Sequence, residues 1–102
     1  MERFLPQDEY VRRISRVQKA LAAAGLDGLL ASANATIYYL TGHVLGGFIY
    51  VPTEGEPIWF VRRPKGLQRD DVVYIKKPEQ IPGLMAERGQ KMPVRLGLEL
   101  GR

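Results

Sequence analysis

The first part of the chain changes from a helical to a strand-like pattern of apolar residues. From Asp8 to Ala24, apolar side chains recur at spacings of four, three, four and three, which predicts an amphipathic helix. Its expected buried positions are Tyr10, Ile14, Val17, Leu21 and Ala24. Asp8 is the expected N-cap, and Gly25 is expected to end the helix in the left-handed conformation. The run "DGLLAS" that follows indicates a short buried strand.

A second, shorter helix is predicted over "ATIYYL", with Ser32 or Asn34 as its cap and Gly42 as its stop. The large side chains of this helix lie next to a buried strand, so we expect them to pack in the core. They are Tyr38, Tyr39 and Leu40. The glycines of "GHVLGG" then indicate a bend into the next strand.

Residues 47 to 62 predict two strands joined by a turn at Thr53-Glu54-Gly55-Glu56. Neither strand alternates apolar with polar residues, because positions 48–51 and 58–61 are all apolar. Such strands are typical of a sheet with both faces covered.

The last third predicts shorter elements. "PKGLQRDD" is expected to be a loop or a helical turn, and "VVYIKK" a fourth strand. A short helix opens at Ile81-Pro82 and runs through "GLMAERG", and "VRLGLEL" predicts a fifth strand. Helices interleaved with strands buried on two faces indicate an α/β fold with a mixed β-sheet flanked by helices.

Composition and charge narrow the function classes. With 102 residues there is room for a single domain, 1–102. The chain has no cysteine, so disulfides and thiolate metal sites are excluded. No apolar run has the length of a signal peptide or membrane span, so we expect a soluble, cytoplasmic protein with no membrane partner.

A net charge of +4 raises the question of nucleic-acid binding. The basic residues fall into two groups, a stripe on the first helix and a looser cluster after the third strand: Arg12, Arg16 and Lys19, then Arg62, Arg63, Lys65 and Arg69. The first is typical of a solvated helix face, and the second lacks the interleaved aromatics of RNA-binding segments. The pattern therefore does not favour nucleic acid as a partner.

The sequence offers few residues that could serve in catalysis or metal binding. One histidine and no cysteine mean that any metal site would rest on carboxylates. Asp70 and Asp71 would point to opposite faces of the strand they lead into, so a capping or solubilising role is expected of them. "GHVLGG" follows a helix, the reverse of a phosphate-binding loop, and Ser32 lacks a nucleophile-elbow frame. His43 is expected to be a polar residue beside a helix C-terminus.

Three segments, "KALAAAGLDGLLAS", "NATIYYLTG" and "EPIWFVRR", occur in this order. Together they resemble the N-terminal domain of the creatinase and Xaa-Pro peptidase family, which includes prolidase and aminopeptidase P. The resemblance runs from about Arg12 to Glu99 and implies a ribonuclease-H-like mixed sheet flanked by helices. It also implies that the domain stops before its last helix and strand, so it is truncated at its C-terminal end.

In that family, catalysis belongs to a following pita-bread domain. There, two aspartates, a histidine and two glutamates hold two divalent metal ions (Mn, Co or Zn) that activate a water molecule. Nothing in this sequence matches those ligands, so the resemblance implies a non-catalytic half with no catalytic and no metal-binding residues. Its expected partners are the missing C-terminal catalytic domain, a second copy in a homodimer, and an Xaa-Pro peptide substrate.

The resemblance also nominates site residues. In relatives, the loop after the "YLTG" element approaches the active site of the neighbouring subunit and helps to close the substrate pocket. The matching positions here are Tyr39, Thr41, Gly42, His43 and Phe48. Arg62 and Arg63 match the family's "VRR" strand end, and the alternative for them is a solvated strand terminus. His43 departs from the family, where an aromatic residue often follows the glycine.

Two functions from different classes follow. The first is the N-terminal domain of an Xaa-Pro metallopeptidase, inert alone and acting in dimerisation and pocket closure. The second is a stand-alone peptide- or protein-binding domain that lacks the catalytic half. Continuation of the native reading frame into a metal-binding domain separates them.

Overall fold

The computed structural model describes residues 4–67, 69–89 and 96–98, the last three by their backbone alone. Five strands form one mixed sheet in the order β4-β3-β2-β1-β5. They are β1 (Gly28–Ala31), β2 (Gly46–Pro52), β3 (Ile58–Arg63), β4 (Val72–Tyr74) and β5 (Leu96–Leu98). β1–β2 and β2–β3 pair antiparallel, whereas β3–β4 and β1–β5 pair parallel. The predicted mixed α/β sheet is confirmed.

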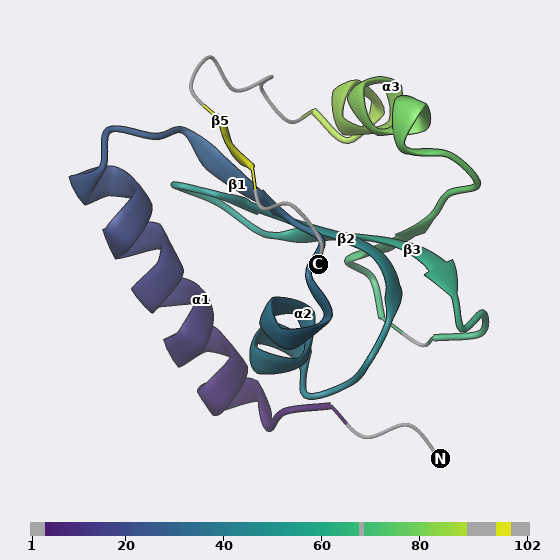
Figure 1. Ribbon diagram of the computed structural model, residues 1–102, viewed down its shortest axis with the longest axis horizontal. Coiled ribbons are helices and arrows are strands. Elements are labelled where there is room, and N and C mark those ends of the chain that lie inside the picture. Colours follow the sequence, from purple (N-terminus) through teal and green to yellow (C-terminus); the bar gives the residue numbers. More distant parts are fainter. Residues whose placement is uncertain (1–3, 68, 90–95, 99–102) are drawn as a thin grey trace.

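Helices cover both faces of this sheet. The helices α1 (Gln7–Ala23) and α2 (Asn34–Thr41) lie on one face, and α3 (Ile81–Glu87), preceded by a 3₁₀ turn at Pro78–Gln80, lies on the other (Figure 1). Among the described residues, no helix is long and apolar enough to cross a membrane.

The continuous apolar run of β3 explains why both faces need cover. Successive residues of a strand point to opposite faces. Trp59 and Val61 join the core beneath α1 and α2, and Ile58 and Phe60 join the core beneath α3. All four are at most 2% exposed, so the prediction of a strand buried on both faces is confirmed.

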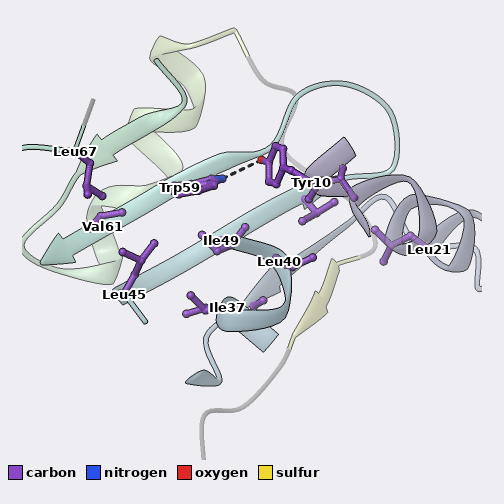
Figure 2. Packing of buried hydrophobic residues seen from close by; sticks show 12 residues of the cluster. Tyr10, Leu21, Ile37, Leu40, Leu45, Ile49, Trp59, Val61 and Leu67 are labelled. Atoms are coloured by element: carbon purple, nitrogen blue, oxygen red, sulfur yellow. Dashed lines mark hydrogen bonds between the residues drawn. The ribbon is translucent and has the colours of Figure 1, made fainter. Parts of the chain in front are cut away.

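The larger core lies between the sheet and the two N-terminal helices (Figure 2). α1 contributes Tyr10, Ile14 and Leu21, as its spacing predicts, with Val17 packed at the margin. The remaining predicted position, Ala24, is exposed because the helix ends one residue earlier. Gly25 has a φ of 72°, as expected for a helix stop.

The predicted N-caps of both helices are wrong. α1 begins after Pro6, with no side-chain cap, so Asp8 lies inside the first turn, where its negative charge still suits the positive end of the helix dipole. α2 begins after Ala33, and neither Ser32 nor Asn34 caps it. Pro6 and Ala33 have extended backbones that turn the chain into each helix without a side-chain acceptor.

The later elements are shorter than the sequence predicts. β4 stops at Tyr74, and within "VVYIKK" the apolar Ile75 is buried while the two lysines are exposed. The segment "PKGLQRDD" is a loop in its described part, and α3 opens with Pro82 in its first turn, as predicted. Of the predicted last strand, Leu96–Leu98 form β5, and the rest of "VRLGLEL" lies outside the described residues.

Replacing Ile37 tests the packing of α2. The side chain is fully buried against the sheet, so Ile37→Ala should lower the free energy of unfolding by about 2–5 kcal/mol, through lost burial and a residual cavity. Val11→Ala, at a 51% exposed position on α1, is the control and should change it by less than about 0.5 kcal/mol. Urea unfolding measures both. Equal losses in the two variants would contradict the assignment of Ile37 to the core.

Candidate functional site

The turn between α2 and β2 is the part of the molecule on which the sequence places most of its candidate residues. Leu40 and Thr41, at the end of α2, point into the core and are at most 1% exposed. Gly42 follows in the left-handed conformation, with a φ of 78°, and its N–H donates to the carbonyl of Tyr38 at 2.7 Å. The predicted helix stop at Gly42 is therefore confirmed.

The Thr41 hydroxyl holds the two sides of the turn together. Its Oγ1 lies 2.7 Å from the carbonyl oxygen of Ile37 and 2.8 Å from that of His43, and its single hydrogen can be donated to one of them at a time. The same oxygen accepts the His43 N–H at 3.1 Å. A single buried hydroxyl thus joins the last turn of α2 to the residue that leaves it.

The N-terminal segment packs against the outside of this turn. Leu5 N–H donates to the Thr41 carbonyl at 3.1 Å, and the Phe4 ring meets the His43 ring edge-on with 5.5 Å between centroids. A Cβ atom on Gly42 would lie 2.9 Å from the Leu5 nitrogen. Glycine is therefore required at position 42 both for its backbone conformation and for this close approach.

Tyr38 and Tyr39 are not in the core, contrary to the sequence prediction. They are 57% and 37% exposed, because α2 is only eight residues long and turns its Ile37, Leu40 and Thr41 face to the sheet. Tyr39 is fixed by α1 instead. The Arg13 guanidinium lies 4.6 Å from the centre of its ring and donates to its carbonyl at 2.7 Å.

Arg13 is itself oriented by Glu9 on the same helix. Its Nε donates to a Glu9 oxygen at 2.8 Å, and Arg12 pairs with the other oxygen. The hydrogen bond from Arg13, followed by the positive charges nearby, lowers the pKa of Glu9. The predicted solvated face of Arg12, Arg16 and Lys19 is exposed in the structure, and Arg16 also donates to the Tyr39 hydroxyl at 3.4 Å.

The structure does not bring all the nominated residues together. Tyr39, Thr41, Gly42 and His43 form one continuous stretch on the α1–α2 face. Phe48 packs against the core under α3, on the other face of the sheet. Arg62 is exposed at the end of β3, where the pairing shifts from Gly47–Val61 to Gly46–Arg63 and leaves Arg62 as an extra residue in the strand.

Sequence reasoning missed a cluster around Trp59. The Arg69 guanidinium lies 4.0 Å from the centre of the Trp59 ring and 5.0 Å from that of Tyr10, and both Asp71 oxygens accept from it at 2.9 and 2.8 Å. Asp71 therefore binds Arg69 instead of capping or solubilising. The two residues are separated by one position, and only the fold shows that they face a buried tryptophan.

Tyr10 completes this cluster from α1. Its hydroxyl accepts the Trp59 indole N–H at 3.0 Å (Figure 2). Burial raises the pKa of Tyr10 to about 12, and the hydrogen bond from Trp59 offsets part of that effect.

A pocket of about 380 Å³ lies beside the turn. It is lined by Asn34, Val44, Gly46, Arg63 and Pro64.

For metal binding, no group of three or more histidine or acidic side chains in the described part of the chain is arranged to hold an ion. The residues present therefore do not fit the metal pair of the peptidase family.

Comparison with known proteins identifies relatives of this fold. The family model of the creatinase/prolidase N-terminal domain matches residues 13–102. No curated protein sequence matches the chain. The structure is similar to that of aminopeptidase P, an Xaa-Pro aminopeptidase, from Streptococcus thermophilus, with a TM-score of 0.62 and 20% identity. That match covers 87% of this chain and 73% of the other, and at this identity it shows the fold alone.

The role of the Thr41 hydroxyl in holding the turn can be tested by comparing two substitutions. Thr41→Val removes it and leaves the buried carbonyls and the His43 N–H without this partner, which should cost about 1–3 kcal/mol of unfolding free energy. Thr41→Ser keeps the hydroxyl oxygen and should lose less unfolding free energy than Thr41→Val. Amide hydrogen exchange at His43 should be faster in Thr41→Val alone. Equal exchange rates in the two variants would show that the hydroxyl does not hold the turn.

The raised pKa of Tyr10 predicts that the folded chain becomes less stable in alkaline solution. Its pKa is about 12 in the folded chain, above the value of 10.0 for a free tyrosine, so the folded state keeps a proton that the unfolded state gives up. The resulting stabilisation is complete below pH 10 and is lost between pH 10 and 12. Two pKa units correspond to about 2–3 kcal/mol.

Urea unfolding at pH 8 and pH 11, followed by tryptophan fluorescence, should show about half of this loss, because pH 11 lies midway between the two pKa values. Burial also raises the pKa of Tyr50, so Tyr10→Phe should reduce the pH dependence without abolishing it. An unchanged pH dependence in Tyr10→Phe would contradict the assignment to Tyr10.

Proposed function

The chain belongs to the family of creatinase/prolidase N-terminal domains, and we propose that it is the non-catalytic N-terminal domain of an Xaa-Pro metallopeptidase. The family membership confirms the resemblance seen in the sequence. In this proposal, the two divalent metal ions and the residues that activate water belong to a catalytic domain outside these 102 residues. The chain contributes a surface for dimerisation and a wall of the substrate pocket.

The observation that carries the proposal is the way the turn from Tyr39 to His43 is built. Thr41 and Gly42 are anchored from inside and from the N-terminal segment, while Tyr39 and the partly exposed His43 lie at the surface. This combination suits an element that contacts substrate across a subunit interface, because a side chain whose position is fixed beforehand loses less conformational entropy on binding.

The roles of the nominated residues differ in this proposal. Tyr39 and His43 are the residues that would contact a peptide, and Thr41 and Gly42 position them. Phe48 packs on the other face of the sheet, so its contribution would be made at a different part of the pocket or at the dimer contact, and Arg62 is exposed where β3 ends opposite the start of β2.

A second candidate, a stand-alone peptide- or protein-binding domain, is favoured by the exposed apolar groups near the same turn. Tyr38 is 57% and Val44 60% exposed, and apolar side chains that gather into one surface patch mark interaction sites. The natural reading frame after Arg102 separates the two candidates. Continuation into a domain with the metal-binding aspartates, histidine and glutamates supports the peptidase, and a stop codon close to Arg102 supports the binding domain.

The non-catalytic part of the proposal has a direct assay. The 102-residue chain, with Mn²⁺ or Co²⁺ added, should not hydrolyse an Xaa-Pro peptide, because it supplies no described cluster of metal ligands. Hydrolysis above the rate of the metal ions alone would overturn this part.

Two variants in the complete enzyme test the turn. Tyr39→Ala and His43→Ala should each raise KM for an Xaa-Pro peptide several-fold with kcat nearly unchanged, because they remove binding contacts and leave the metal centre intact. Lys76→Ala, at an exposed position after β4, is the control and should change neither constant. Unchanged KM in both turn variants would remove the turn from the substrate pocket.

A further inference from the structure

The pocket beside the α2–β2 turn combines three kinds of chemistry in a small space. Asn34 opens α2, Val44 lies in the turn, Gly46 begins β2, and Arg63 and Pro64 end β3 and begin the next loop. Its volume of about 380 Å³ falls within the range of small-ligand sites. The pocket therefore offers a cation, an amide and apolar walls to a small ligand.

Arg63 has no acidic partner within the described residues. The three ion pairs of that part of the chain join Glu9 to Arg12 and Arg13, and Arg69 to Asp71. An exposed arginine offers its planar fork of N–H donors to a ligand, and this fork matches the two oxygens of a carboxylate. The charge in the pocket is thus available to an anion.

Local backbone structure places the Arg63 side chain at the pocket. Because β3 carries Arg62 as an extra residue, Arg63 pairs with Gly46, and strand bulges of this kind redirect the side chains around them. A Cβ atom on Gly46 would lie 3.1 Å from Cγ and 3.3 Å from Nε of Arg63. The absence of a side chain at Gly46 is what lets Arg63 lie across the start of β2.

The other lining residues fit a peptide better than an inorganic anion. The Asn34 side chain can donate to and accept from a peptide group, and Val44 and Pro64 supply apolar contact. A phosphate group is usually met by several cations or by a nest of backbone N–H groups, and this pocket is lined by a single arginine.

From these observations we propose that the pocket formed by Asn34, Val44, Gly46, Arg63 and Pro64 binds the C-terminal carboxylate of a short peptide through Arg63. This site goes beyond the proposed function and needs no catalytic domain, so it can be tested on the 102-residue chain. If the proposed function also holds, the site lies next to the turn that would contact substrate.

The test is a titration of the chain with N-acetyl-alanyl-alanine, followed by NMR chemical shifts of the backbone amides. The amides of Val44 and Gly46 should shift with a Kd of roughly millimolar, as expected for a small ligand in an open pocket. The C-terminal amide of the same peptide should bind about tenfold more weakly, because it lacks the charge that Arg63 recognises. Inorganic phosphate is the third probe and should bind more weakly than the free acid.

Three variants assign the binding to one side chain. Arg63→Ala should weaken binding of the free acid about tenfold, and Arg63→Lys should weaken it by a smaller factor, because an ammonium group keeps the charge but not the fork. Lys65→Ala removes the same charge from an exposed residue two positions away, which does not line the pocket, and should change the Kd by less than twofold.

Several results would overturn the site. They are equal affinity for the acid and the amide, tighter binding of phosphate than of the peptide, an equal loss in Lys65→Ala and Arg63→Ala, and the lack of any shift at Val44 and Gly46. None of these results bears on hydrolysis by the complete enzyme, so failure of this site and failure of the proposed function are distinguishable.

Discussion

The rest of the structure depends on the burial of Trp59. This residue is fully buried at the centre of β3, and three separate parts of the chain meet on it. α1 provides the Tyr10 hydroxyl that accepts its N–H, the loop before β4 provides the Arg69 guanidinium over its ring, and the N-terminal segment provides Phe4. A polar group on a buried aromatic needs a partner, so the position of α1 on the sheet is fixed by chemistry as well as by packing.

This arrangement also explains how a short chain presents an ordered turn. Phe4 touches both Trp59 and His43, and the next residue along, Leu5, donates to Thr41. The core under α1 and the candidate turn are therefore connected through the same short N-terminal segment. The order of the turn comes from long-range contacts as much as from the helix that precedes it.

The sequence predicts the elements well and the site only in part. Apolar spacing in α1 and the unbroken apolar runs of β2 and β3 carry strong information, because periodicity and burial on two faces leave few alternatives. Helix caps failed at Asp8, Ser32 and Asn34, since an extended backbone can start a helix without a side-chain acceptor. The sequence predicts Tyr38 and Tyr39 in the core because large side chains beside a buried strand usually pack there, but it does not show which face of a short helix meets the sheet. The Arg69 cluster and the Arg63 pocket join residues from separate elements, so no local pattern could indicate them.

The turn contains two groups of residues, one that fixes the backbone and one whose side chains are exposed at the surface. Leu40, Thr41 and Gly42 face inward or are packed by Leu5, while Tyr38 and Val44 point outward with more than half of their surface free. Mutations of the second group cost little in folding, whereas mutations of the first group affect the core. Natural selection could therefore alter what this surface recognises, one exposed side chain at a time, on a scaffold that stays the same.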